Sequence, residues 1–464
     1  MGILSALNKS VGGLNAQSFA LENISGNIAN SQTTGYKRTD TSFTDLVGAG
    51  TARITQLAAG NVRASSRSTV TVQGAIEGNS VETFLGIKGD GFFSVLQKSG
   101  EANGASTFET SMAYTRRGDF QINKEGYLVN GAGYFLAGLA IDPATNNPVG
   151  DTPGVIQIDK SPVEAEASTT INYRLNLPTE PKTKFSETNT DTSITDENMW
   201  TTSGGRTGPP ATGEVTDELN EEFLNNSISG GAVTGYDSLG NAVNVQLRWA
   251  KTADNEWQLY YQNEASDPNT AATGDVMWTQ INSGGAGPEF TFDSDGKVVE
   301  DVANLELASD LEIGGKTLSG ITISFGDGLT QYADASQQAN VRQLTQDGLP
   351  AGNFQDVSIT DGGRVVANYS NGKTVDLFQI PLVSFQGASA LKPLDGGAYA
   401  ETRDSGPAVS NASGNIIGAS LENSNVDISE EFTKLIVTQQ AFSANSKVIS
   451  TADQMMSDVL NIIR

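Results

Sequence analysis

The chain has 464 residues, which at about 150 residues per domain predicts two to four domains. Its 54 acidic residues against 28 basic ones give a formal charge of -26, which repels phosphate backbones and anionic lipid and argues against a nucleic-acid partner. Cysteine and histidine are both absent, which removes disulfides, thiolate nucleophiles, imidazole bases and the commonest metal ligands. No stretch approaches the roughly 18 uninterrupted apolar residues of a membrane span, and the start MGILSALNKSVGG lacks the pattern of a secretory signal. We therefore expect no cofactor and no membrane insertion.

A helix with an apolar seam is predicted over residues 1–32. Spacings of three and four residues define a heptad pattern that Ser18 and Ser25 interrupt. The apolar seam residues are Leu4, Leu7, Val11, Leu14, Leu21 and Ile28. Only Lys9 and Glu22 are charged before Asn30, which is too few for a helix that faces water on all its other sides. We expect more of this helix to be buried than one partner helix can cover.

A second helix is predicted at the other end of the chain, within residues 421–464. Asp427, Ser429 and Glu430 supply the chemistry of a helix start. The apolar seam residues of this helix are Phe432, Leu435, Phe442, Ile449, Met456, Leu460 and Ile463. At 1.5 Å per residue the two helices are about 40 and 50 Å long, so they can pair antiparallel. The heptads alone also fit a two-helix subdomain that packs only on its own protein.

Nearly everything between the two helices predicts strands and turns. The expected parts are linkers or extended segments at 33–70 and 400–420, a middle β domain at 71–144 with 353–399, and an outer β domain at 145–352 that carries a long loop at 186–222. Turn residues predict hairpins in 84–96, 118–136 and 357–385, and one between 244–249 and 256–262. The predicted fold class is mainly β with α-helical termini, built as discontinuous nested domains: a terminal helical coiled-coil domain and two β-rich domains.

No motif points to catalysis or to metal binding. Asp293, Asp295 and Gly296 resemble the start of a calcium loop, but the later ligands are missing, so a hairpin turn is the better interpretation. The run GIKGDG at 86–91 is neither a Walker loop nor a dinucleotide-binding turn. With 54 acidic residues, chance carboxylate pairs are common, so no pair singles out glycoside hydrolysis. We expect no catalytic, cofactor-binding or metal site.

Three linked stretches resemble one family of known proteins. The stretch IANSQTTGYKRTDTSF at 28–43 resembles the ANxxTxGYK signature of the axial rod and hook proteins of bacterial flagella. GDGFF, YTRRGDF at 114–120 and EGYLVN at 125–130 resemble the first β block of that family, and 420–455 is similar to its C-terminal signature. The signature residues are Ala29, Asn30, Thr33, Gly35, Tyr36, Lys37, Asn423, Asn425, Val426 and Asp427.

Within that family, the central insertion of about 210 residues is similar to hook subunits rather than to compact distal rod proteins. TQDGLPAG at 345–352 and YSNGKTV at 369–375 support this choice. The resemblance implies an extracellular structural subunit that catalyses nothing, self-assembles into a flexible helical tube at the basal body and transmits motor torque to the filament. The seam residues of both helices would then form the self-assembly interface.

The resemblance also implies partners. They are many copies of the chain itself, the distal rod, the hook cap, the hook–filament junction proteins and the flagellar type III export apparatus. Two alternatives stay open: a distal rod or hook-associated axial protein, and a carbohydrate-active or adhesive surface protein.

Overall fold

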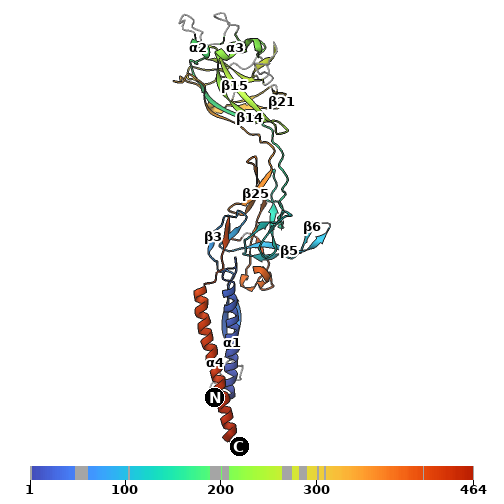
Figure 1. The fold of residues 1–464 in the computed structure, drawn as a ribbon, viewed down its shortest axis with the longest axis vertical. Coiled ribbons are helices and arrows are strands. Elements are labelled where there is room, and N and C mark those ends of the chain that lie inside the picture. The colour runs from blue at the N-terminus through green and yellow to red at the C-terminus, as the bar shows by residue number, and fades with distance from the viewer. Residues whose placement is uncertain are drawn as a thin grey trace. The chain divides into compact units, whose positions relative to one another are not determined.

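The computed structural model confirms a mainly β chain with one long helix at each end (Figure 1). It describes residues 3–462 except 47–60, 103–104, 189–199, 201–207, 264–273, 282–289, 300–302, 308–309 and 411, and for 3–6, 46, 61, 105 and 459–462 the backbone only. The chain forms two compact units. Unit 1 comprises Met1–Lys160, Gln355–Asn368 and Thr374–Arg464, and unit 2 comprises Ser161–Phe354 with Tyr369–Lys373. Unit 2 is therefore an insertion in unit 1.

Unit 1 begins and ends in the helices α1 (Ile3–Ala29) and α4 (Ile428–Ile462), which lie side by side and antiparallel (Figure 1). The strands β1 (Thr39–Leu46) and β2 (Asn61–Ser68) pair as a hairpin that packs along α1. This hairpin falls inside the segment predicted as extended, where the Thr, Ser and Ala residues show no alternating apolar face. Among the described residues, no helix combines the length and apolar character that a membrane crossing needs.

The remaining strands of unit 1 come from both halves of the chain. Those before unit 2 are β3 (Ile76–Gly78), β4 (Leu85–Lys88), β5 (Phe92–Ala102), β6 (Ala105–Phe108), β7 (Ala113–Thr115), β8 (Gln121–Ile122), β9 (Leu128–Val129), β10 (Tyr134–Ala140) and β11 (Gly154–Val155). Those after it are β25 (Phe354–Ile359), β26 (Arg364–Tyr369), β27 (Thr374–Gln379), β28 (Leu382–Ser384), β29 (Lys392–Pro393), β30 (Ala398–Ala400), β31 (Val409–Ser410), β32 (Asn415–Gly418) and β33 (Ser420–Glu422).

Strands from the two halves alternate in the main sheet of unit 1. Its central path runs β25-β26-β27-β10-β5-β7-β30-β29. β10 pairs with β27, β5 pairs with β28, and two smaller sheets join β3 to β33 and β4 to β32, all antiparallel. Without the other half, the strands of either half would have unpaired backbone N–H and C=O groups along their edges. Both halves must therefore be present for this sheet to form.

The described part of unit 2 contains two larger sheets and a short pair. One sheet runs β19-β22-β12-β23 with β24 also on β12, and the other runs β13-β17-β16-β15-β14 with β18 on β16. The strands are β12 (Thr170–Leu177), β13 (Glu214–Thr216), β14 (Ser227–Tyr236), β15 (Ala242–Ala253), β16 (Glu256–Gln262), β17 (Val276–Gln280), β18 (Phe290–Thr291), β19 (Asn304–Glu306), β20 (Leu311–Ile313), β21 (Lys316–Leu318), β22 (Thr322–Ser324), β23 (Leu329–Gln331) and β24 (Asn340–Gln346), and the helices are α2 (Lys184–Thr188) and α3 (Asp217–Asn226).

The apolar faces of the two sheets share one core. Tyr173, Trp249 and Trp257 are fully buried in it. A second cluster lies under α3, around Phe223 and Trp200. Because its largest side chains are completely covered from within, unit 2 has the core of a self-sufficient domain.

Most of the predicted hairpins are confirmed. β9 pairs antiparallel with β8 and β10, β26 with β27, and β15 with β16. Asp293 accepts the backbone N–H groups of Asp295 (2.9 Å) and Lys297 (2.8 Å), which confirms a hairpin turn there. The hairpin predicted for 84–96 is wrong, because β4 pairs with β32 and β5 with β7, β10 and β28. Most of β4 and the first half of β5 are buried on both faces, so their apolar pattern gave no information on which neighbour each strand takes.

Candidate functional site

Most of the buried residues of α1, which packs against α4 and against the β1–β2 hairpin, are small or polar. On α1 the buried residues recur every three to six positions, and they are Ser10, Ala16, Ala20, Ile24 and Asn27. Gly13 lies among them, where an added Cβ would come within 2.9 Å of Asn445 Nδ2 on α4. Side chains of this size let two helix axes approach closely.

On α4 the buried positions follow a strict heptad. Glu431, Thr438 and Ala452 are buried at multiples of seven residues, and Asn445 occupies the position between the last two. The helices therefore pair in a coiled-coil register, but the register is occupied by polar and small residues instead of leucines.

The apolar seam predicted from the sequence lies beside this contact and not at its centre. Half-buried at its edge are Leu7, Leu14, Leu21, Ile28, Leu435, Ile449 and Met456. Exposed are Val11 (41%), Phe432 (49%) and Phe442 (37%). The side chains of Leu4, Leu460 and Ile463 lie outside the described residues. The prediction assigned the contact between the helices to the largest apolar residues. In the structure, the small residues that precede several of them lie at the contact instead, because they let the helices pack closely.

The seam residues of the two helices lie on one side of the pair. On each helix a seam residue follows a buried residue by one or four positions. Its side chain therefore points about 100° or 40° away from the buried face, always in the same direction around the helix axis. Because the helices are antiparallel, the same rotation on each helix points to the same side of the pair. Together they form one apolar face, which we call the seam face.

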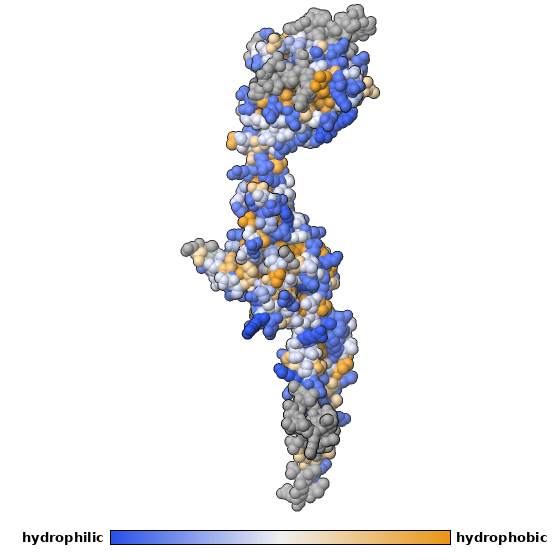
Figure 2. Space-filling model, turned by 180° about the vertical axis from the view of Figure 1, so that it is seen from behind, coloured by the Kyte–Doolittle hydropathy of each residue, from blue (hydrophilic) through white to orange (hydrophobic). Residues whose placement is uncertain are grey.

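Sequence reasoning missed several further exposed apolar residues on α4, of which Ile436 and Val437 are the most exposed. Ile436 is 54% exposed and Val437 is 60% exposed. They follow Leu435, and three consecutive apolar residues on a helix point in three directions about 100° apart. The run itself was the signal, because no single partner helix can cover all three. Figure 2 shows hydrophobic residues reaching the surface of the helical part.

A buried ionic cluster lies where the helices meet the β part of unit 1. Lys37 and Glu422 form an ion pair with both side chains fully buried, and Arg116 Nη1 lies 3.4 Å from the other Glu422 oxygen. Lys37 Nζ also donates to Val72 O (2.7 Å), and the Gly74 N–H donates to Glu422 Oε1 (2.8 Å). Burial lowers the pKa of Lys37, and the carboxylate of Glu422 opposes that shift. Each charge has its partner, as a buried ion requires.

Signature residues surround this cluster. The Gly35 N–H donates to the backbone oxygen of Glu422 (2.7 Å). Gly35 has a φ of +67°, and a Cβ there would lie 2.8 Å from the backbone of Arg117, so only glycine fits. Asn425 Oδ1 accepts the backbone N–H of Arg38 (2.7 Å), and Asn425 Nδ2 donates to Val72 O (3.1 Å).

The start of α4 is tied to the end of α1. Asp427 Oδ1 caps α4 by accepting the N–H groups of Ser429 (2.8 Å) and Glu430 (3.2 Å). One turn later, Glu431 Oε2 accepts a hydrogen bond from Asn27 Nδ2 of α1 (3.0 Å), and Asn27 Oδ1 accepts one from the Tyr36 hydroxyl (3.3 Å).

The other signature residues lie in the same place. Ala29 ends α1, Thr33 Oγ1 donates to Asn30 Oδ1 (3.2 Å), the Asn423 N–H donates to Ala75 O (2.8 Å), and the Val426 N–H donates to Ser424 Oγ (3.3 Å). Two signatures almost 400 residues apart in sequence thus build one junction. We call it the junction.

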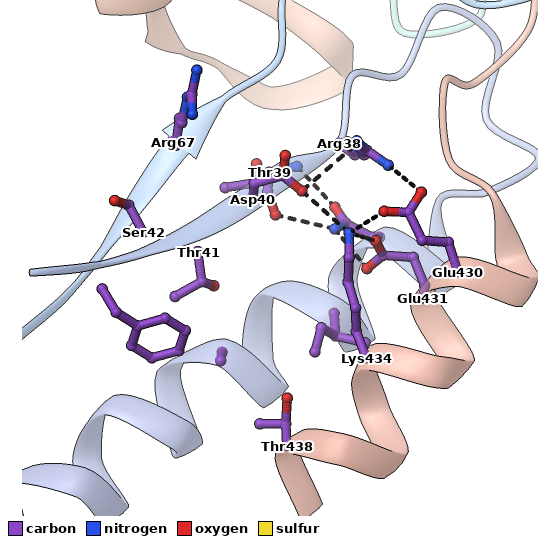
Figure 3. Close-up of a pocket in the computed structure, with 14 residues that line it drawn as sticks. Arg38, Thr39, Asp40, Thr41, Ser42, Arg67, Glu430, Glu431, Lys434 and Thr438 are labelled. Atoms are coloured by element: carbon purple, nitrogen blue, oxygen red, sulfur yellow. Dashed lines mark hydrogen bonds and ion pairs between the residues drawn. The ribbon is translucent and has the colours of Figure 1, made fainter.

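A groove of about 580 Å³ opens beside the junction (Figure 3). Lys434 Nζ lies 2.9 Å from carboxylate oxygens of both Glu430 and Glu431 and 3.6 Å from Asp40. Arg38 Nη1 lies 2.9 Å from Glu430 Oε2. The hydrogen bonds from Lys434, and then from Arg38, lower the pKa of Glu430. These charges lock β1 against the start of α4.

The ion pairs and hydrogen bonds of the junction connect the helix ends to the strands. Within the described ranges there is no group of three or more metal-ligating side chains that could hold an ion. Glu422 pairs with both cations of the cluster, Lys37 and Arg116, and the backbone donors and acceptors around it tie helix ends to strands. Such an arrangement fixes two helices to a sheet.

Four family models match the chain, and all describe flagellar proteins. They are Flagella basal body rod protein (residues 7–37), Flagellar hook protein FlgE/F/G D1 domain (86–174), Flagellar basal body protein FlaE D2 domain (206–349) and Flagellar basal body rod FlgEFG protein C-terminal (418–462). The first and last models contain the two halves of the junction.

Full-length relatives carry one description. The flagellar hook protein FlgE of Escherichia coli K12 is 29% identical over 470 residues, covering 98% of this chain and all of the relative. The FlgE of Brucella suis is 28% identical over 469 residues and covers both chains completely. The crystal structure of Helicobacter pylori flagellar hook protein FlgE2 matches 74% of this chain and 99% of its own, with 16% identity and a TM-score of 0.44. The four models together span most of the sequence and the relatives align from end to end, so the chain is similar to flagellar hook proteins along its whole length.

Proposed function

We propose that the chain is the structural subunit of the bacterial flagellar hook. It self-assembles into a flexible helical tube that carries motor torque to the filament, outside the cell and attached to the basal body. It is not an enzyme. The observation that carries the assembly is the set of large apolar residues on the helices that the chain itself leaves uncovered.

Burial of these residues requires further copies of the chain. α1 covers one side of α4, while Phe432, Ile436 and Val437 point to other sides and stay about half exposed. A helix that is apolar on several sides is stable in water only when several partners surround it. Copies of the same helix pair supply such partners through the seam face. The seam residues of both helices are therefore the proposed self-assembly interface.

The junction gives the tube a way to transmit force. In the proposed tube the helices hold neighbouring copies together, and torque must pass between them and the β part of the same copy. The buried ion pair of Lys37 with Glu422 and the tie between Asn27 and Glu431 resist rotation there. A breach of this cluster would leave a buried charge without a partner, which is costly.

The wider assembly follows from this role. The proposed partners at the two ends of the tube are the distal rod and the hook–filament junction proteins, with the hook cap at the growing end. The proposed route out of the cell is the flagellar type III export apparatus. Support comes from the helices themselves, because isolated helices are marginal in water and so are readily kept unfolded for export. We also propose three nested modules in one copy: the helices, a middle β domain and an outer β domain.

Complementation tests the proposed function. The chain is expressed in its own host after deletion of the native gene, and hook-basal bodies are purified and imaged by electron microscopy. We expect a curved tube beyond the rod and restored motility. The same chain is also expressed in a strain that lacks only the distal part of the rod. If it restores the tube in that strain but not in the strain without its native gene, the chain belongs to the rod instead.

A further inference from the structure

Unit 2 carries most of the negative charge of the chain. It contains 29 acidic residues and 10 basic ones, and unit 1 contains 25 and 18, which together make the 54 and 28 of the whole chain. The formal charge is therefore -19 on unit 2 and -7 on unit 1. This uneven distribution means that unit 2 dominates the electrostatic repulsion between two copies of the chain.

Acidic side chains of unit 2 lie at its surface, on several different elements. The core of the unit is apolar and aromatic, so the charges are excluded from it. Exposed glutamates that form no ion pair with another described residue lie on β13, α3, β19 and β20, and they are Glu214, Glu218, Glu221, Glu306 and Glu312. Charges in contact with water are free to repel the charges of another copy, and dissolved salt screens this repulsion.

Assembly of copies concentrates these acidic surfaces. Each copy in the proposed tube brings one unit 2 with it, because the chain itself joins unit 2 to unit 1. Polymerisation therefore raises the local concentration of unit 2 far above its concentration in solution. Like charges repel over the Debye length, which is about 30 Å at 0.01 M salt and about 3 Å at 1 M salt. The repulsion is strong in dilute buffer and weak in concentrated salt.

We propose that repulsion between the units 2 of neighbouring copies opposes assembly, so that the ionic strength of the medium sets the concentration above which tubes form. The proposal rests on the proposed function, because it concerns the regulation of the tube. Burial of Phe432, Ile436 and Val437 against other copies favours assembly, and the charge of unit 2 opposes it. Salt screens the opposing contribution, so it shifts the equilibrium toward the tube.

The critical concentration for tube formation, measured against salt, tests this proposal. The full chain is incubated at a series of concentrations in NaCl between about 0.01 and 1 M, and sedimentation separates tubes from monomer. We expect the critical concentration of the wild-type chain to fall at least about tenfold over this range. Variants are needed as well, because salt also acts on the burial of apolar surface, and that contribution is the same in every variant that keeps the helices unchanged.

Two variants with the same total charge distinguish unit 2 from the chain as a whole. Each replaces four exposed glutamates by glutamine. The variant of unit 2 lowers the charge of that unit from -19 to -15 and carries Glu214→Gln, Glu221→Gln, Glu306→Gln and Glu312→Gln. The matched control lowers the charge of unit 1 from -7 to -3 and carries Glu77→Gln, Glu82→Gln, Glu109→Gln and Glu401→Gln. Because repulsion between equal units scales with the square of their charge, the first variant loses about three times as much repulsion as the second.

We expect the unit 2 variant to form tubes in dilute buffer at a critical concentration at least about threefold below that of the unit 1 variant, with a weaker dependence on salt. Tryptophan fluorescence and circular dichroism confirm that both variants are folded. Equal shifts in the two variants, or a wild-type critical concentration that does not change with salt, overturn the proposal and leave the hook function intact. Failure of the wild-type chain to form tubes at any salt concentration would instead refute the proposed function.

Discussion

Unit 2 and the helix pair of unit 1 differ in how far their largest apolar side chains are exposed to water. In unit 2 Trp249 and Trp257 are fully covered by the chain's own sheets. On α4 Phe432, Ile436 and Val437 are about half exposed, while most of the buried residues of α1 and α4 are small or polar. Unit 2 is complete as a single copy. In the proposed tube, other copies of the chain cover the helix pair and complete its packing.

The two regions also differ in the polar groups that they bury. In unit 2 the Tyr173 hydroxyl is satisfied by neutral partners, since it donates to Gly230 O (2.6 Å) and accepts from Trp249 Nε1 (2.8 Å). At the junction the buried groups are the charges of Lys37 and Glu422. Neutral hydrogen bonds fix a core, whereas a buried ion pair penalises every arrangement that separates its partners.

The largest effect is expected from a charge placed on the exposed apolar surface of α4. Ile436→Asp should abolish polymerisation at concentrations where the wild-type chain forms tubes, because the carboxylate would be buried against another copy. The free energy of unfolding of the monomer should hardly change, since Ile436 is 54% exposed there. Sedimentation and electron microscopy measure the polymer, and urea unfolding measures the monomer.

Leu239→Asp in unit 2 is the matched control. Leu239 is 81% exposed, more than Ile436, so exposure alone would predict the larger effect for Leu239. We expect normal tubes from Leu239→Asp. Equal loss of polymer in both variants would show that unit 2 also depends on neighbours, and the contrast between the regions would fail.

A second, smaller effect is expected at the junction. Glu422→Gln leaves Lys37 and Arg116 buried without their carboxylate, which should destabilise unit 1 by about 3–5 kcal/mol. The two units can be followed separately in one denaturation experiment. All four tryptophans lie in unit 2, so their fluorescence reports unit 2, whereas far-UV circular dichroism reports mainly the long helices of unit 1.

In Glu422→Gln the helical signal should be lost at a lower urea concentration while the tryptophan transition stays in place. Glu101→Gln is the control, because Glu101 forms an exposed ion pair with Lys98 in the same unit and exposed pairs contribute little. If both transitions shift together in Glu422→Gln, the units unfold cooperatively and the junction is not a separate source of stability.

The sequence predicted the two helices and their antiparallel pairing because apolar periodicity reports helices reliably. It did not predict which face makes the contact. Leu14 and Leu21 are the larger apolar residues, yet Gly13 and Ala20 beside them let the helices approach, and periodicity alone weighs size over fit.

The junction shows the same limit for charged residues. Lys37 was identified through a family signature, but Glu422 and Arg116 were not singled out. Nothing in the local sequence marks a glutamate as buried, since its burial depends on strands from both ends of the chain. Strand pairing over such separations, as between β4 and β32, is set by tertiary packing and not by local turns.

The smallest effect is expected from one hydroxyl in unit 2. Tyr173→Phe leaves the Trp249 N–H and the Gly230 carbonyl buried without this partner, which should cost about 1–3 kcal/mol. The tryptophan transition should move to lower urea while the helical signal and the tubes remain as in the wild-type chain.

Tyr332→Phe is the control for this prediction. Tyr332 lies in the same unit, but 47% of its surface is exposed, so water can serve as the hydrogen-bond partner of its hydroxyl and the loss of that hydroxyl should cost little. If Tyr173→Phe weakens the tubes as well as unit 2, the core of unit 2 must influence assembly. A unit that is complete alone can lose stability without changing how copies join. Weaker tubes would therefore mean that other copies complete the packing of unit 2 as well as that of the helix pair.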